Sequence, residues 1–158
     1  MFFGKQIVLV SLIFIPFSVF GSEAATAAPH GEELALLNEI NRVRAAHSAP
    51  PLRIDRRLER AARAHSGDML RRGYLSHRAF AQRLTGFGAR GRAVGENLAW
   101  GVGSRASAQA IVAAWLASPP HRANLLRRGF RRVGVGRLVG TFAGNGGAAV
   151  VTADFAGR

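Results

Sequence analysis

The stretch Trp115–Leu126, with the sequence WLASPPHRANLL, decides how this chain is organised. An apolar segment at helical spacing leads into it, and two prolines follow. Proline lacks a backbone N–H and pushes the residue before it out of the helical region, so Pro119 and Pro120 predict a helix end at Ser118. We expect His121 to begin a second, short helical turn, where the backbone holds its side chain. The segment is either a functional corner or a plain helix–loop–helix junction.

Outward from this corner, the pattern of apolar residues predicts further helices and strands. Helical spacing is found over residues 32–47, over residues 56–72 after Asp55 as a helix N-cap, and over residues 108–118 after Ser107. A short helical turn is expected over residues 80–84. Alternation predicts strands over residues 131–139 and 148–155, with residues 144–147 as the turn between them. Residues 94–100 are expected to be extended, and residues 86–95 to form a glycine- and arginine-rich loop.

The N-terminal 27 residues have the layout of a secretory signal peptide. A short positive segment ending at Lys5 precedes a nearly unbroken apolar run over residues 7–20, and Ala25-Thr26-Ala27 offers small residues for cleavage. The apolar run is shorter than the roughly 20 residues that span a membrane, and no other segment approaches that length. We therefore expect residues 1–27 to be removed, residues 28–33 to form a short lead and residues 34–158 to form one domain. An uncleaved anchor is the alternative.

Composition limits the chemistry that this domain can perform. The chain has no cysteine, which excludes disulfides, a thiol nucleophile and a thiolate zinc site. It has 22 Lys plus Arg against 9 Asp plus Glu, for a formal net charge of +13. Such a charge favours anionic partners, such as anionic envelope polymers or acidic lipid surfaces. Nucleic acid is not expected as a partner, because no strand combines aromatic and basic residues and because the chain is expected to be exported.

Three polar groups stand at or beyond the ends of predicted elements: His77, Glu96 and His121. Scaffolds commonly present functional side chains at such places. Glu96 shares strand parity with apolar residues, so its carboxylate needs donors or a cation. Two imidazoles and a carboxylate can bind a divalent cation such as zinc, or activate a water molecule. His65, by contrast, lies on the apolar face of its helix and is expected to be a buried, hydrogen-bonded core residue.

Five motifs in this order resemble bacterial proteins of the CAP superfamily, named after cysteine-rich secretory proteins, antigen 5 and pathogenesis-related 1; its domain is also called SCP. The motifs are Ala64–Met69, Tyr74–His77, Gly95–Ala99, Trp115–Leu126 and Val133–Gly136. The resemblance covers roughly residues 34–155. It implies an α+β fold, an α-β-α sandwich with a small antiparallel sheet between helices.

The resemblance also implies a surface cleft. In the family this cleft is lined by two histidines and acidic residues, and some members bind a divalent cation there; the matching positions are His77, Glu96 and His121. His77 and His121 would be the metal ligands. The eukaryotic branch has a second glutamate shortly after the tryptophan that matches Trp115, and this chain has no acid there. It also has Pro120 where bacterial relatives often have glycine.

Three functions are compatible with these residues. The first is an exported binding protein, periplasmic or extracellular, whose cleft takes a lipid or a cell-wall fragment; the family suggests this most often. The second is a hydrolase in which His77 and His121 hold a cation or water, with Glu96 as base. The third is a purely structural triad that ties three loops together. We expect a binding protein rather than an enzyme.

Overall fold

The computed structural model describes residues 31–157, which form three layers. In chain order the elements are α1 (Gly31–Ala46), β1 (Arg53–Ile54), α2 (Arg56–Arg72), α3 (Phe80–Gly86), β2 (Val94–Gly101), the 3-10 helix η1 (Gly103–Ala106), α4 (Ala108–Ala117), α5 (Pro119–Leu126), β3 (Phe130–Phe142) and β4 (Asn145–Gly157). The predicted signal peptide and residues 28–30 of the predicted lead lie outside the described residues. Residues 31–33 of that lead already belong to α1.

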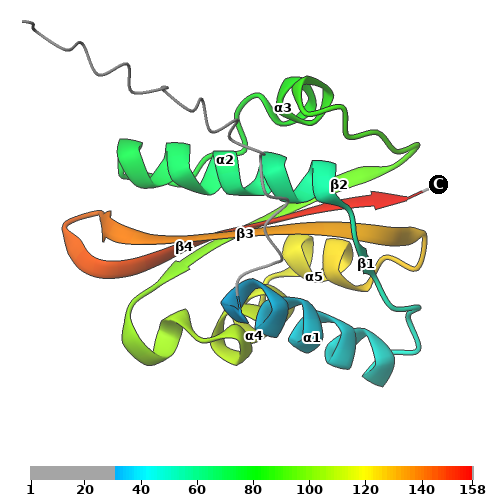
Figure 1. Ribbon diagram of the computed structural model, residues 1–158. Helices are drawn as coiled ribbons and strands as arrows, with labels where there is room; N and C mark the ends of the chain where they lie inside the picture. The colour runs from blue at the N-terminus through cyan, green and yellow to red at the C-terminus, as the bar shows by residue number, and fades with distance from the viewer. Residues whose placement is uncertain (1–30, 158) are drawn as a thin grey trace, which may run out of the picture.

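A four-stranded sheet separates two helical layers, with α2 and α3 on one side and α1, α4 and α5 on the other (Figure 1). The strand order is β1-β3-β4-β2, and β4 pairs antiparallel with both β3 and β2. The expected α-β-α sandwich is therefore confirmed. The short β1, which the apolar pattern does not predict, adds one parallel pairing to β3.

Local sequence explains where several elements begin and end. Asp55 accepts hydrogen bonds from the backbone N–H groups of Arg57 and Leu58, and so caps α2 as predicted. The β3–β4 hairpin is longer and its turn tighter than expected. Its turn residues are Ala143 and Gly144, both with positive φ, which matches the right-handed twist of the flanking strands.

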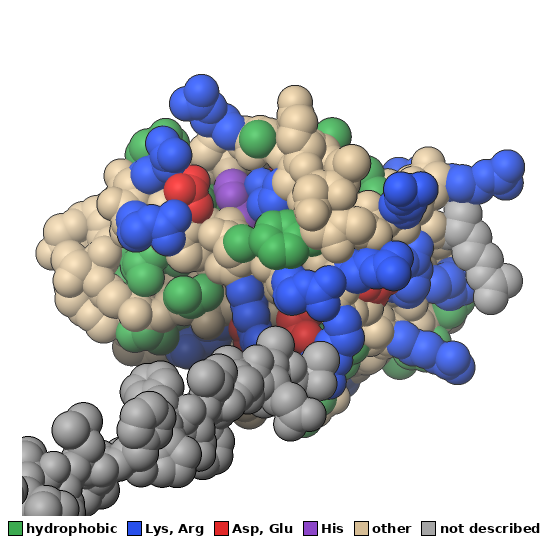
Figure 2. All heavy atoms as spheres, turned by 45° about the horizontal axis from the view of Figure 1, so that its top comes forward, with side chains coloured by type: hydrophobic (Ala, Val, Ile, Leu, Met, Phe, Trp, Pro, Cys, Tyr) green, Lys and Arg blue, Asp and Glu red, His purple; other side chains and the backbone are tan. Residues whose placement is uncertain are grey.

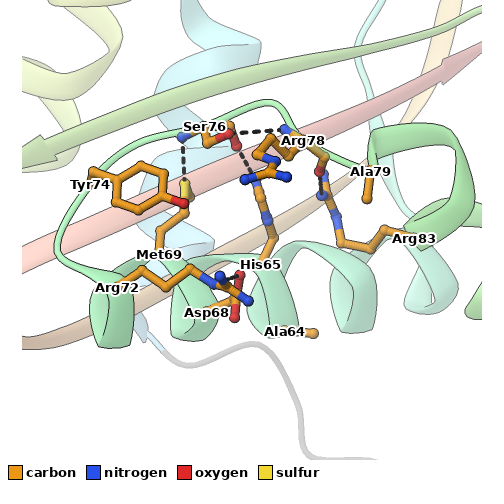
Figure 3. Close-up of a pocket in the computed structure, with 10 residues that line it drawn as sticks. All are labelled: Ala64, His65, Asp68, Met69, Arg72, Tyr74, Ser76, Arg78, Ala79 and Arg83. Atoms are coloured by element: carbon orange, nitrogen blue, oxygen red, sulfur yellow. Dashed lines mark hydrogen bonds and ion pairs between the residues drawn. The ribbon is translucent and has the colours of Figure 1, made fainter.

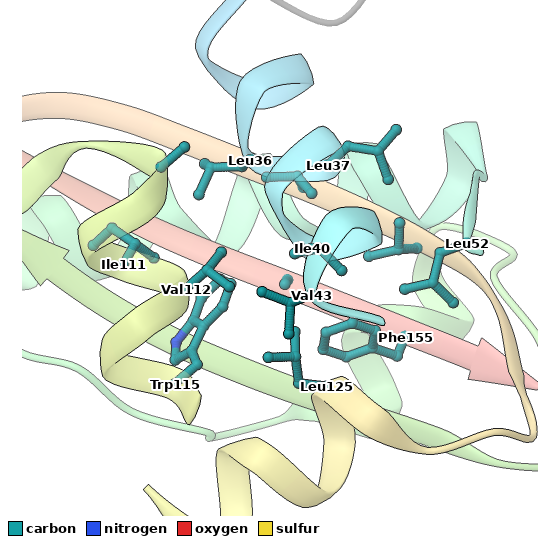
Figure 4. Packing of buried hydrophobic residues seen from close by; sticks show 14 of the residues in the cluster. Leu36, Leu37, Ile40, Val43, Leu52, Ile111, Val112, Trp115, Leu125 and Phe155 are labelled. Atoms are coloured by element: carbon teal, nitrogen blue, oxygen red, sulfur yellow. The ribbon is translucent and has the colours of Figure 1, made fainter. Parts of the chain in front are cut away.

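The main core lies between the sheet and the layer of α1, α4 and α5 (Figure 4). Ile40 and Val112 are fully buried there, and Trp115 is 1% exposed while its indole N–H donates to the Leu98 carbonyl at 2.9 Å. Burial of an aliphatic or aromatic side chain of this size contributes about 1.5–3 kcal/mol. The core therefore fixes α4 and its C-terminal corner against β2. In the described part of the chain, no helix is long and apolar enough to cross a membrane.

One buried cation joins elements of this layer. The Arg44 guanidinium is fully buried and donates to the carbonyls of Pro50 (2.8 Å), Leu125 (2.7 Å), Arg127 (3.2 Å) and Phe130 (3.2 Å). Burial lowers the pKa of Arg44 from its ordinary value. The side chain thus joins the end of α1 to the end of α5 and the start of β3.

Candidate functional site

The corner that carries His121 is built by two consecutive helices. Helix α4 ends at Ala117, and α5 begins at Pro119 itself, so the prolines open the second helix as well as ending the first. Proline is suited to the first positions of a helix because the N–H that it lacks has no intrahelical partner there. His121 is consequently the third residue of α5, as the sequence analysis expected of a short helical turn.

Two asparagines fix this corner against β2. The fully buried Asn97 donates to the His121 carbonyl at 3.0 Å. Asn124 of α5 donates to the Glu96 carbonyl at 3.2 Å and to the Asn97 side-chain oxygen at 3.1 Å. A Cβ at Gly95 would lie 2.7 Å from the side-chain oxygen of Asn124, so this close approach requires glycine. The Gly95-Glu96-Asn97 motif therefore holds β2 and α5 at contact distance.

Both carboxylate oxygens of Glu96 are engaged by neighbouring side chains. The Glu96 side chain is only 2% exposed, and its Oε1 accepts from His77 Nδ1 at 2.8 Å. Its Oε2 accepts from the Arg83 guanidinium, which comes from α3 and is itself 10% exposed. A buried carboxylate needs this kind of compensation, because removing an unpaired charge from water costs several kcal/mol.

The two histidines of the site differ in exposure. His77 lies in the loop between α2 and α3, with a side chain 59% exposed. Because its Nδ1 faces a carboxylate, the neutral imidazole carries its proton there and leaves Nε2 as an acceptor. His121 is half-buried, and both burial and the charge of nearby His77 lower the pKa of His121 from its ordinary value. The structure thus places the His77 ring directly on Glu96, while the backbone carbonyl of His121 is held by Asn97, the next residue of β2.

Two residues of this cluster, Arg83 and Asp154, were not predicted from the sequence. Asp154 of β4 is the Cα partner of Glu96 in β2 and is fully buried, 3.8 Å from Arg83. Neither carboxyl oxygen of Asp154 accepts a hydrogen bond from a donor group within residues 31–157. Burial and the charge of Glu96 raise the pKa of Asp154 well above its ordinary value, against the smaller effect of Arg83. One arginine therefore faces two buried carboxyl groups. In the sequence, the only signal for Asp154 was its place in an otherwise apolar predicted strand, and Arg83 had no such signal.

His65 lies behind the same cluster. It is 6% exposed and donates through Nε2 to the Ser76 carbonyl at 2.7 Å, so the expectation of a buried, hydrogen-bonded histidine is confirmed (Figure 3). Its Nε2 lies 3.7 Å from Glu96 Oε2. Burial, followed by the charge of Arg83, lowers the pKa of His65. His65 is therefore a neutral support for the loop that carries His77.

The side chains do not form a ready three-ligand metal site. Within residues 31–157, no group of three or more His, Asp or Glu side chains is arranged to hold a metal ion. His77 Nδ1 and Arg83 already occupy both oxygens of Glu96, so among the three predicted residues only the imidazoles of His77 and His121 remain as metal ligands. Structural and catalytic zinc sites use at least three protein ligands. Zinc binding by His77 and His121 stays a prediction.

Comparison with known proteins gives relatives for most of the chain. YkwD of Bacillus subtilis, an uncharacterized protein, is 31% identical over 123 residues, which are 73% of this chain and 47% of that protein. The chain therefore spans about half the length of this relative.

Solved structures show the same fold. An extracellular protein containing an SCP domain from Bacillus anthracis matches with a TM-score of 0.69 and 27% identity, over 81% of this chain and 41% of that one. An outer surface protein from Borrelia burgdorferi matches with a TM-score of 0.71 and 24% identity, over 84% of this chain and 96% of that one.

The family comparison covers the residues of the candidate site. Residues 37–155 match the CAP family, described as the cysteine-rich secretory protein family, and this range contains His77, Glu96 and His121 as well as Arg83 and Asp154. On this match, which covers most of the chain, the protein belongs to the CAP family.

Proposed function

We propose that this protein is an exported CAP-domain protein whose cleft, formed by His77, Glu96 and His121, binds a lipid or a cell-wall fragment of the envelope. One observation carries the proposal: the cleft carboxylate is buried and fully paired, so imidazoles are the polar groups that remain for a ligand. Export is supported by two similar structures, one of an extracellular protein and one of an outer surface protein.

The cleft is suited to hydrogen bonding with a polar head group. His77 Nε2 is an acceptor when the ring is neutral and a donor when it is charged, and the half-buried His121 favours the neutral form. Glu96 holds the His77 ring in one orientation, which reduces the entropy lost when a ligand binds. The role of Glu96 in this proposal is to position His77.

The experiment is co-sedimentation of the purified protein with peptidoglycan sacculi and with phosphatidylglycerol vesicles. We expect His77→Ala and His121→Ala each to weaken binding to one of these probes about tenfold, because a hydrogen bond to a charged group contributes about 1.5–3 kcal/mol. His47→Ala is the matched control, since His47 is exposed just after α1 and outside the cleft. Equal binding by all variants would contradict the proposal. A calorimetric zinc titration of the same proteins tests the predicted cation.

A hydrolase is the second candidate, and the 2.8 Å contact between His77 and Glu96 favours it. A carboxylate that orients an imidazole is the arrangement of a general base. In this arrangement His77 takes the proton, rather than Glu96 as the sequence analysis expected, because both Glu96 oxygens are engaged. Hydrolysis of p-nitrophenyl butyrate that is lost in His77→Ala and kept in His47→Ala would favour this candidate. A structural triad predicts no loss in either assay.

A further inference from the structure

A cavity of about 360 Å³ lies beside the proposed cleft, and His65 and Arg83 contribute to its wall (Figure 3). Its other walls come from the C-terminal half of α2, from the loop over residues 74–79 and from α3. Its volume falls at the lower end of the range of roughly 300–1,000 Å³ that ligand pockets occupy. Neither His77 nor His121 lines it, so the proposed function of the cleft does not use this space.

The lining of the cavity carries an excess of positive charge. Arg72, Arg78 and Arg83 contribute to it, against the single acid Asp68. Asp68 is already paired with Arg71 at 3.1 Å and with Arg72 at 2.8 Å. Arg78 is exposed and forms no ion pair within the described part of the chain. Guanidinium groups bind carboxylates and phosphates through paired, charge-assisted hydrogen bonds, so Arg78 is available to an anion.

The same cavity has an apolar wall. Met69 in this wall is almost fully buried, whereas Tyr74 is 45% exposed. An exposed aromatic ring in the same lining as an unpaired arginine fits a ligand that has both an apolar part and a charged part. On the face that carries α2 and α3, arginine side chains lie among patches of hydrophobic side chains (Figure 2).

Hydrogen bonds across the cavity hold its walls in place. His65 donates to the Ser76 carbonyl at 2.7 Å, and the Ser76 N–H donates to the sulfur of Met69 at 3.5 Å. Arg83 donates to the Arg78 carbonyl at 3.2 Å. These bonds join α2, the loop and α3, so the cavity is formed before a ligand arrives, which lowers the cost of binding.

We propose that this cavity is a second binding site, which takes a small amphipathic anion. The phosphate or carboxylate head lies at Arg78, and a short apolar body packs against Met69 and Tyr74. This site is separate from the His77–Glu96–His121 cleft but shares a wall with it, because His65 and Arg83 line the cavity and also approach Glu96.

The test uses Tyr74, which is the only tyrosine of the chain. Incorporation of 3-fluorotyrosine therefore gives a single ¹⁹F resonance in the lining of the cavity. We expect titration with hexyl phosphate to shift this resonance saturably. Arg78→Ala is expected to weaken the affinity about tenfold, whereas the matched control Arg53→Ala, in β1 at the opposite edge of the sheet from β2, is expected to keep it. No shift, or equal affinity in both variants, overturns the proposal.

Further probes separate the parts of the ligand and its source. Inorganic phosphate and 1-hexanol are each expected to bind about tenfold more weakly than hexyl phosphate, because each lacks one of the two contacts; phosphate that binds equally well overturns the amphipathic requirement. Monomeric dihexanoyl phosphatidylglycerol and acetyl-D-alanyl-D-alanine then distinguish a lipid from a cell-wall source. His121→Ala is expected to leave the Tyr74 shift unchanged. The variant therefore distinguishes a wrong proposal for the cleft from a wrong proposal for the cavity. A shift lost in His121→Ala contradicts two separate sites.

Discussion

At the scale of single residues, Arg83 holds the candidate site together. It faces Glu96 and Asp154, and its side chain is 10% exposed. Removing one partner of a buried ion pair costs about 3–5 kcal/mol, because the other charge stays buried and unpaired. We expect Arg83→Met to lose about this much free energy of unfolding in urea. The exposed Arg53→Met is the control, with a change below about 0.5 kcal/mol. A loss below about 1 kcal/mol in Arg83→Met would show that Glu96 does not depend on this arginine.

Asp154 gives a prediction about pH at the same scale. Its pKa is raised in the folded protein, whereas in the unfolded chain an aspartate ionises near its ordinary pKa of about 3.9. Above that pH the unfolded state binds fewer protons, so the contribution of Asp154 to stability is lost as pH rises toward the raised pKa.

Asparagine cannot ionise and has nearly the same shape. We therefore expect Asp154→Asn to raise the urea midpoint at about pH 8 relative to the wild type, with a gain that shrinks toward about pH 4. Urea unfolding at several pH values measures this difference, and the other titrating groups are common to both proteins. A gain that does not change with pH would mean that Asp154 is not the titrating group.

At the scale of elements, α2 packs on β3 through glycine. A Cβ at Gly134 would lie 2.0 Å from the carbonyl carbon of Leu58 and 2.1 Å from the nitrogen of Glu59. Gly134→Ala must push α2 away from the sheet, and we expect a loss of at least about 1–3 kcal/mol. Gly146→Ala is the control, because nothing lies within 4 Å of its Cβ position. Thermal unfolding of both variants measures this loss. Equal unfolding midpoints would mean that α2 moves away from the sheet without loss of stability.

The elements also show what sequence alone can predict. The caps at Asp55 and Ser107, the corner at Ser118 and the closing hairpin follow from local rules, because each depends on residues only a few positions apart. The pairing of Glu96 with Asp154 does not, because β2 lies beside β4 rather than beside β3, the next strand in sequence. Arg83 was missed for a similar reason: its contacts depend on how α3 packs, and no local pattern encodes that. His77, Glu96 and His121 stand out in the sequence by their places at element ends, and the family resemblance added the expectation that they line one cleft.

At the scale of the whole molecule, the net charge of +13 is the dominant property. We expect binding to phosphatidylglycerol vesicles to weaken strongly between about 0.1 M and about 1 M NaCl, over which the Debye length falls from about 10 Å to about 3 Å. Co-sedimentation measures this, with phosphatidylcholine vesicles as the uncharged control. Binding that is independent of salt would show that apolar contacts, rather than the arginines, attract the protein to such a surface.

The buried Arg44 has a consequence for how the chain is made. Its partners at Leu125 and Phe130 lie 81 and 86 residues further along the chain. During synthesis α1 therefore leaves the ribosome long before the carbonyls that satisfy its guanidinium exist. Closing so long a loop delays the final docking step, since its entropy is lost before the contact forms. Helix α1 is thus translated first but is among the last elements to reach its final contacts. The nascent chain cannot complete this packing until α5 and the start of β3 have been synthesised.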